Sequence, residues 1–379
     1  MRYIIRSLRK LKDVRQPWKI KHRLSDILVI SIIAIMCGAT SSAQIAKFGV
    51  LREKWLRKFL PLENGMPHRL TVERVLSLLR PKEFQELFTE IMQRMQTVTK
   101  GSVVALDGKA FHTRNGKDGK TQVMYMVSAW CDTNKLTLGQ IQADEKGNEI
   151  TAIPELLALL DIKDSIVTID AIGCQHEIVK MIRKDKKADY GIALKANQPT
   201  MCSEMRTYAQ DCLNDPLMKD MYVQHTTLEK GHGRIEKRVY SLFHDLRWFK
   251  DRKQWYGLAS LIRVDSTRTV GTMPPTYETR YYISSLTAVQ DAARAIRAHW
   301  GIENRLHWVL DVVSREDGWV TRQATLAANL ATIRKLALAF LRKTDIPNPH
   351  NLSGPMKMWA CALDLRSLES TIFGSTLFS

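Results

Sequence analysis

Residues 102 to 109 read SVVALDGK, an apolar run that ends in an acid, a glycine and a lysine. Its β-branched content is typical of a buried strand. Two more runs of strand character follow at 123–132 and 135–144, and the two residues between them suffice for a hairpin turn. The sequence therefore predicts a meander of three strands that begins near Gly101.

Strands and helices alternate after this meander. The runs at 152–161 and 176–186 have helical spacing, whereas those at 165–172 and 190–196 have the composition of buried strands. Because alternating strands and helices usually build a sheet with parallel neighbours, the whole stretch predicts a mixed α/β sheet.

The segments on either side of this sheet differ in character. Helical spacing recurs before residue 100, strand-like runs separated by polar turns fill 199–286, and helical spacing returns at 288–310 and 324–343. The predicted domains are an all-α N-terminal domain at 1–100, an α/β core at 101–198 and 287–343, a β-rich insertion at 199–286 and a tail at 344–379.

The charge balance points to a polyanionic partner. The 379 residues carry 57 Lys and Arg against 39 Asp and Glu, a formal net charge of +18. Such an excess usually accompanies nucleic-acid binding, although a basic protein can also be merely soluble. Nine basic residues and one acid lie between residues 1 and 23. This density suits an arm that contacts phosphates, and equally a solvated tail.

Cysteine and hydropathy patterns exclude other classes. The six cysteines form no C-x-x-C pair, which argues against a zinc knuckle or a disulfide framework and favours a reducing compartment. The longest apolar run, at 27–39, is shorter than the roughly 20 residues that span a bilayer. It is predicted to be a buried helix, and no membrane partner is expected.

Three acids stand where chemistry is expected. Asp107 and Asp170 each follow an apolar strand, so each should project from the edge of the sheet into the loops where α/β folds place ligands. Taken singly, such an acid more often stabilises a turn. Glu303 lies on a predicted helix with His299 four residues before it and His307 four residues after, on one face.

Alternatives to Glu303 remain open from the residues alone. Glu236, Glu316 and Asp317 are rival third carboxylates, and Glu303 could also be a solvated acid on a core helix that Trp300 and other bulky residues anchor. A zinc site between the two histidines is a further alternative, but three ligands spread over two helical turns seldom converge on one ion. Three carboxylates could instead hold divalent cations that act on a phosphodiester.

Six blocks in order carry a family resemblance: VVALDGKAFH (103–112), GNEITAIPELLALLDIKDSIVTIDAIGCQ (147–175), ALKANQ (193–198), HGRIEKR (232–238), RYYISS (280–285) and HWGIENRLHWVLDVVSRED (299–317). Over about 13–343 the chain resembles bacterial insertion-sequence transposases that include the H-repeat-associated proteins. These are DDE transposases with a ribonuclease-H-like catalytic core.

The resemblance implies a catalytic and metal-binding triad of Asp107, Asp170 and Glu303. It implies two Mg²⁺ ions, for which Mn²⁺ can substitute, and hydrolysis at transposon ends followed by transfer of the 3′ hydroxyl to target DNA. The expected partners are double-stranded DNA, as terminal inverted repeats and as target, and further copies of the chain in a dimer or larger complex. The expected location is the bacterial cytoplasm, at the nucleoid.

Relatives in the broader group of transposases carry a Tyr, Arg, Glu, Lys signature on the last helix. This chain departs from it, with Ile296, His299 and Leu310 where Tyr, Arg and Lys would stand. Other polar residues in the matching blocks are therefore the candidates for DNA contacts. These are Lys109, Lys195, Asn197, Gln198, Arg234, His299, Arg305 and His307, with His112 a further possibility. Two alternative functions stay open: an inactive remnant that only binds DNA, and a structure-selective nuclease on the same core.

Overall fold

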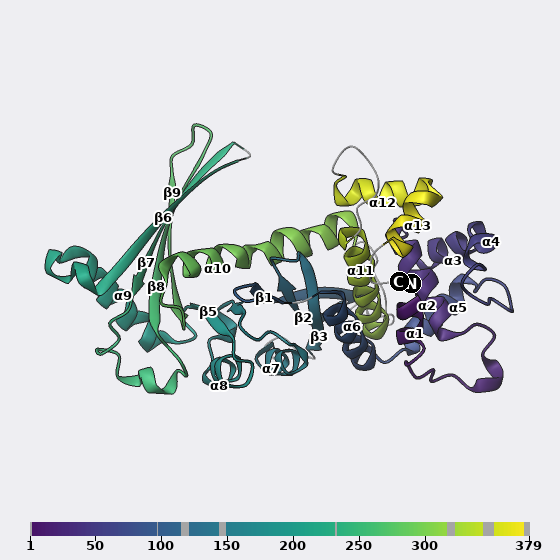
Figure 1. Cartoon of the computed structure of the whole chain (residues 1–379), viewed down its shortest axis with the longest axis horizontal. Helices are drawn as coiled ribbons and strands as arrows, with labels where there is room; N and C mark the ends of the chain where they lie inside the picture. Colours follow the sequence, from purple (N-terminus) through teal and green to yellow (C-terminus); the bar gives the residue numbers. More distant parts are fainter. Residues whose placement is uncertain are drawn as a thin grey trace.

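A computed structural model describes residues 2–96, 98–114, 121–143, 149–231, 233–316, 323–343 and 352–374. One nine-stranded sheet runs through the middle of the molecule, with helices packed along it (Figure 1). The strands are β1 (Val103–Arg114), β2 (Thr121–Cys131), β3 (Leu136–Ala143), β4 (Ile166–Ile169), β5 (Asp189–Leu194), β6 (Tyr222–Gly231), β7 (Arg234–Phe243), β8 (Ser260–Val270) and β9 (Thr276–Ser284).

The sheet has the order β3-β2-β1-β4-β5-β9-β8-β7-β6. The first three strands pair antiparallel, and β1, β4 and β5 pair parallel. The predicted meander and mixed α/β sheet are thus confirmed. Leu106 on β1 is paired with Ile169 on β4, so the residues that follow them, Asp107 and Asp170, lie side by side where β4 ends. The prediction that Asp107 ends its strand is wrong, because β1 continues to Arg114 and Asp107 is itself paired with Ser128 on β2.

The described helices lie along this sheet and beyond one end of it (Figure 1). They are α1 (Arg2–Leu8), α2 (Leu24–Met36), α3 (Ser42–Leu51), α4 (Glu53–Leu56), α5 (Arg69–Leu78), α6 (Pro81–Met95), α7 (Glu149–Leu159), α8 (His176–Lys180), α9 (Pro199–Asn214), α10 (Val289–Ile302), α11 (Ala324–Lys343), α12 (Gly354–Leu363) and α13 (Leu365–Phe373). The sequence did not predict α1, α9, α12 or α13. All other helices lie within predicted helical segments or within a few residues of them.

The two faces of the central strands are covered by different helices. Apolar side chains of α7, α8 and α9 share one core with one face of β1, β4 and β5. The opposite face packs against α10, and the segment after α10 buries Leu306 and Leu310 against Ala105 and Trp130. In Figure 1, α10 accordingly runs along one side of the sheet and α7 and α8 lie along the other.

The helical N-terminal region has its own core. Every residue of α2 is buried, which confirms the prediction of a short buried helix there. The same core takes in side chains of α11, α12 and α13, so the chain returns to its N-terminal helices at its C-terminal end. Among the described residues, α11 alone is long and apolar enough to cross a membrane. Within its apolar window 83% of it is buried inside the protein, as in a core helix.

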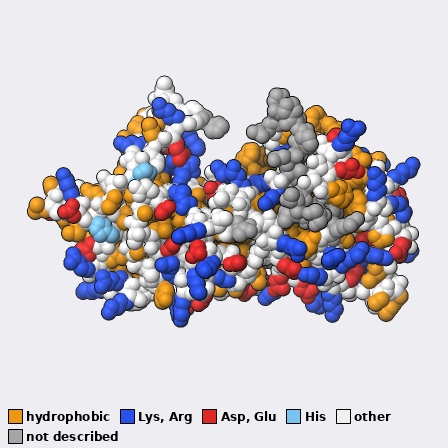
Figure 2. All heavy atoms as spheres, in the orientation of Figure 1, with side chains coloured by type: hydrophobic (Ala, Val, Ile, Leu, Met, Phe, Trp, Pro, Cys, Tyr) orange, Lys and Arg blue, Asp and Glu red, His pale blue; other side chains and the backbone are white. Residues whose placement is uncertain are grey.

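Strands β6 to β9, here called the blade, extend the sheet beyond β5. Within β9, only residues 281–284 pair with β5, whereas the pairing of β9 with β8 continues as far as Thr276. The blade therefore stands out from the body at one end of the molecule (Figure 1), and Figure 2 shows Lys and Arg side chains gathered on it. The β-rich region predicted at 199–286 is thus a continuation of the central sheet that follows one further helix, α9.

Candidate active site

Asp170 opens a short turn whose shape is fixed by neighbouring side chains. A 3₁₀ turn, Ala171–Gly173, follows Asp170 directly. Asn197 donates its Nδ2 to the carbonyl of Ala171 at 2.5 Å, and Gln198 donates Nε2 to the carbonyl of Cys174 at 3.0 Å. Gln198 and Asn197, predicted DNA contacts, therefore hold the loop behind Asp170.

Glu303 marks a change of helix type. The α-helical hydrogen bonding of α10 ends at Ile302, and two π-helical turns follow, Glu303–His307 and Val309–Val313. Because π-helical bonds join residues five apart, the residues after Glu303 leave the faces that α-helical spacing assigns to them. Trp308 is 56% exposed, so it is not among the bulky side chains that hold this helix on the sheet. The guanidinium carbon of Arg280 lies 4.6 Å from the centre of the Trp300 ring.

The three acids influence one another electrostatically. The pKa of Glu303 is raised above its ordinary value, first by burial and then by the negative charges of Asp107 and Asp170. Nε2 of His307 lies 3.2 Å from Oδ2 of Asp107, and the Lys195 ammonium lies 3.3 Å from Oδ1 of Asp170. Each aspartate thus has a basic side chain beside it, whereas His307 and Arg280 offset only part of the rise in the pKa of Glu303.

His299 has a different environment from that expected of a phosphate ligand. Its Nδ1 lies 3.0 Å from the hydroxyl of Thr168 on β4, and burial lowers its pKa. Since a lowered pKa keeps the imidazole neutral at pH 7, His299 serves to tie α10 to the sheet beside Asp170. A charge-assisted contact to DNA phosphate is disfavoured.

The chemistry of this donor set fits a hard divalent cation. Mg²⁺ and Mn²⁺ favour carboxylate oxygens, and a cation would relieve the mutual repulsion recorded in the pKa of Glu303. In the described parts of the chain, however, no three His, Cys, Asp or Glu side chains form a group that could hold one ion. Metal binding would therefore require these carboxylates to turn, Asp170 away from Lys195 included.

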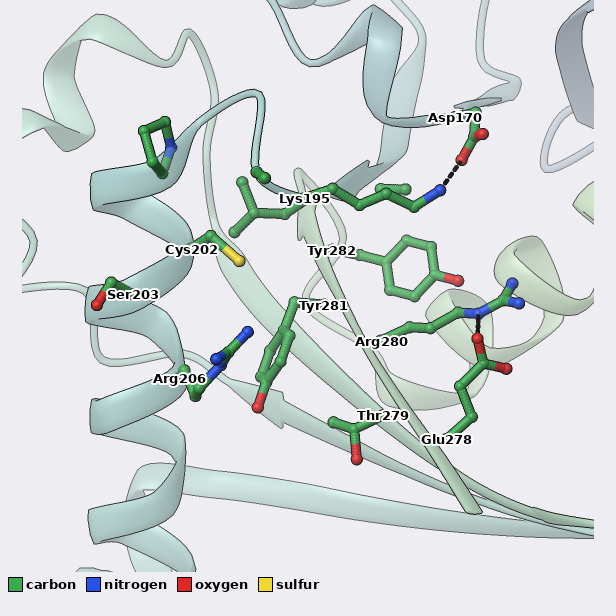
Figure 3. A pocket seen from close by; sticks show the side chains of 14 residues that line it. Asp170, Lys195, Cys202, Ser203, Arg206, Glu278, Thr279, Arg280, Tyr281 and Tyr282 are labelled. Atoms are coloured by element: carbon green, nitrogen blue, oxygen red, sulfur yellow. Dashed lines mark hydrogen bonds and ion pairs between the residues drawn. The ribbon is translucent and has the colours of Figure 1, made fainter. Parts of the chain in front are cut away.

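A cavity of about 470 Å³ opens beside Asp170 (Figure 3). Lys195 and Asp170 face each other at one side of it, and Arg206 of α9 and Tyr281 of β9 lie at the other. Arg280 borders the same cavity and donates its Nε to Glu278 at 2.7 Å. Three of the side chains around this opening are cations, which suits an anionic ligand next to Asp170.

A second cavity, of about 350 Å³, begins at Glu303 and continues along the face of the blade that turns toward α10. We call it the arginine groove, after the five arginines that line it: Arg234, Arg238, Arg268, Arg280 and Arg297. Arg280 borders both cavities. The alternation of arginines along β7 in the sequence RIEKR was a visible signal of such a face, but the partner helix was not.

Glu236, the rival third carboxylate, lies within this groove among cations. Its side chain is 15% exposed and forms an ion pair with Arg238, and Arg234 and Arg268 each lie 3.9 Å away. Three guanidinium groups compensate one carboxylate and repel a metal ion. This surrounding favours Glu303 over Glu236 as the third acid.

Lys109 and the rival Glu316 are also accounted for inside the protein. The Lys109 side chain is 13% exposed and forms ion pairs with Asp311 and, at 3.1 Å, with Glu316, whose side chain is 1% exposed. This placement favours a structural role for both residues over contact with DNA or metal. Asp317 lies outside the described residues, and so does the side chain of His112.

Several predicted DNA contacts are open to solvent, among them Lys195, whose side chain is 60% exposed. Arg305 has a side chain that is 50% exposed and pairs with Asp132 at 3.2 Å, and Arg234 is 42% exposed at the groove. All three remain predictions, as does the wider set of site residues.

Comparisons with known proteins agree with this geometry. A family model described as "Transposase DDE domain" matches residues 99–339, and one described as "DDE_Tnp_1-associated" matches residues 5–92. The chain is 39% identical over 336 residues to "Putative transposase YncI" of Escherichia coli O157:H7, across 88% of this chain and 85% of that protein.

Two further relatives come from Escherichia coli strain K12. "H repeat-associated putative transposase YhhI" is 36% identical over 374 residues, 97% of each chain. A stretch of 65 residues, 17% of this chain, is 42% identical to "Inactive transposase YbfQ".

Proposed function

We propose, from the premise that this chain belongs to the transposase DDE domain family, that it cleaves DNA at the ends of a mobile element and joins the freed 3′ hydroxyl to target DNA. The observation that carries this proposal is the pairing of Leu106 with Ile169, which sets Asp107 beside Asp170, together with the electrostatic coupling of both to Glu303. The substrate is double-stranded DNA, and two copies of the chain act on a pair of ends.

Asp107, Asp170 and Glu303 would hold two Mg²⁺ or Mn²⁺ ions, which when bound activate a hydroxyl nucleophile and stabilise the leaving oxygen of the phosphodiester. The protein's own side chains hold these acids in position. His299 ties the start of the Glu303 helix to β4, and Asn197 holds the turn behind Asp170. These contacts keep the acids together where β4 ends, and a phosphate backbone would approach them there.

Arg280 is the cation best placed for the phosphate that reacts. It borders the cavity at Asp170 and the groove at Glu303, and its positive charge lowers the pKa of Glu303. Stacking over Trp300 and the bond from Nε to Glu278 together fix the guanidinium plane. We assign it the role of contacting the phosphate adjacent to the cleaved bond.

The test uses purified full-length protein, Mg²⁺ or Mn²⁺, and duplex DNA that carries the inverted repeats flanking the gene. We expect nicking at the repeat ends and joining to a second duplex, both abolished by Asp107→Asn. Cleavage without joining, on DNA without repeats, would indicate a structure-selective nuclease. Salt-sensitive binding to the repeats without cleavage would indicate an inactive DNA-binding remnant.

The arginine groove makes a separate prediction about DNA affinity. The Arg268 side chain is 51% exposed, and its Nε lies as far as 3.9 Å from the carboxylate of Glu236. Its positive charge is therefore available to a phosphate. We expect Arg268→Gln to weaken binding to all duplex sequences and to reduce the slope of log affinity against log salt by about 1. Fluorescence anisotropy over a series of salt concentrations measures both quantities.

Arg247 provides the matched control. It is 79% exposed and pairs with Asp245 at 2.8 Å, at a site that contributes nothing to the groove. Arg247→Gln should leave the salt slope unchanged. An equal loss of slope in both variants would mean that the contribution of Arg268 is general charge and that DNA does not follow the groove.

A further inference from the structure

The segment after α10 meets β1 through polar pairs in regular succession. Asp107 and Lys109 are two residues apart on β1 and therefore share a face of the strand. His307 and Asp311, four residues apart on the π-helical segment, lie against them: His307 beside Asp107, and Asp311 in an ion pair with Lys109. The two pairs therefore follow one another in the same order along the strand and along the helical segment.

The apolar contacts of the same segment repeat at every turn. Ile302, Leu306 and Leu310 recur every four residues, and all three are fully buried against Ala105 and Trp130. A shift of the segment by one turn would exchange one large aliphatic side chain for another. The apolar face therefore stabilises the segment on the sheet without defining its position along β1.

The polar pairs do distinguish these positions. If the segment moved along β1 by one turn, the Asp311 carboxylate would reach Asp107, and Lys109 would lose that acid. Glu316, whose side chain is 1% exposed, also lies 3.1 Å from the Lys109 ammonium, and its backbone N–H donates to the carbonyl of Leu310. The same shift would therefore separate a buried acid from Lys109. Charge complementarity thus selects one register out of several that apolar packing allows.

The π-helical turns need such a constraint. A π-helix is rare because its backbone bonding is less favourable, and it persists where tertiary contacts determine it. Glu303 opens the first π-helical turn, and His307 and Asp311 lie in the first and second. The register of the polar pairs therefore also decides where Glu303 stands relative to Asp107.

We propose that Lys109 is a positioning residue, paired with Asp311, that sets the register of the Glu303 segment on β1. This inference rests on the proposed function, because its consequence is the placement of the third acid. It replaces the DNA contact that the sequence suggested for Lys109.

The test compares Lys109→Met and Asp311→Asn with the conservative variant Lys109→Arg. We expect the first two to lower the rate constant for cleavage of bound DNA by about 100-fold, because a misplacement near 1 Å has effects of this size. Their affinity for repeat DNA should stay within about twofold of the wild type, since the groove is untouched. Lys109→Arg, which keeps the charge, should recover most of the rate.

A measurement without catalysis separates this inference from the proposed function. In Lys109→Met, amide hydrogen exchange should become faster across residues 303–313 and stay unchanged in β4 and β5. Lys10→Met is the control, because Lys10 forms an exposed pair with Glu90 at 2.6 Å, and exchange at 303–313 should not change there. If the wild type does not cleave DNA but the exchange result holds, the function is wrong and the register role stands.

Two results would overturn the register role itself. One is unchanged exchange at 303–313 in Lys109→Met. The other is a cleavage rate in Lys109→Met equal to that of the wild type, at equal folded fraction. A variant that fails to fold leaves Asp311→Asn and Lys109→Arg to decide, since both retain nearly the native volume.

Discussion

Glu303→Gln is expected to lower the rate of DNA cleavage on the order of 10³-fold or more, while Glu236→Gln leaves cleavage near the wild-type rate. The amide has the volume of the acid but cannot provide the charge that a divalent cation needs. Glu303 stands just after α10, and its pKa is raised by burial and by the negative charges of Asp107 and Asp170. Glu236 is compensated by the arginines of the groove.

The two variants also differ in their expected effect on DNA binding. Glu236→Gln releases Arg234, Arg238 and Arg268 from their shared acid, so affinity for duplex DNA should rise and its salt dependence should steepen. Single-turnover cleavage and anisotropy on the same preparations measure both properties. Full activity in Glu303→Gln with loss in Glu236→Gln would show that the third acid comes from the blade.

The sequence predicted the acids of the sheet better than their surroundings. Asp170 follows an apolar strand as predicted, and Asp107 stands beside it within β1, which continues past the apolar run to Arg114. The pairing of Lys109 with Asp311 joins residues 202 apart, and only the fold brings them together. The sequence analysis named Lys109 as a candidate DNA contact only because it is a polar residue in one of the matching blocks.

Helix α9 was missed for a different reason. Its buried residues are Met201, Cys202, Met205, Ala209 and Cys212, which have helical spacing but are not the large aliphatic residues that make such spacing conspicuous. The sequence predicted only one side of the arginine groove. Alternation along β7 predicts one charged face, but no local pattern says that α10 and Glu303 lie opposite that face.

The cluster behind Lys109 supports a second large effect, on stability. Glu316 lies between Lys109 at 3.1 Å and Arg334 at 3.8 Å, with its own side chain 1% exposed. Lys335 lies nearby and bonds to Ser128 at 3.0 Å; burial lowers its pKa to about 8, while the charge of Glu316 acts in the opposite direction. One buried acid thus compensates several buried cations.

Glu316→Gln is expected to lower the free energy of unfolding by about 3–5 kcal/mol, because removing one partner leaves buried charge uncompensated. Denaturant unfolding at pH 7, followed by circular dichroism, measures it. The exposed pair of Glu63 with Arg23 is the control, and Glu63→Gln should change stability by less than about 1 kcal/mol. A similar small change in Glu316→Gln would mean that the cluster is hydrated and its charges are screened.

Lys335→Met should restore part of the stability of Glu316→Gln, since it removes one of the cations that the missing acid had compensated.

Lys335 also determines how the free energy of unfolding changes with pH. The pKa of Lys335 is about 8 in the folded chain and 10.5 ordinarily, so the unfolded chain binds more protons between these values. The stability of the wild type relative to Lys335→Met should therefore rise with pH across this window, by about 3 kcal/mol in total. A flat difference from pH 8 to 10.5 would show that the Lys335 ammonium is solvated, and that Glu316 compensates only Lys109 and Arg334.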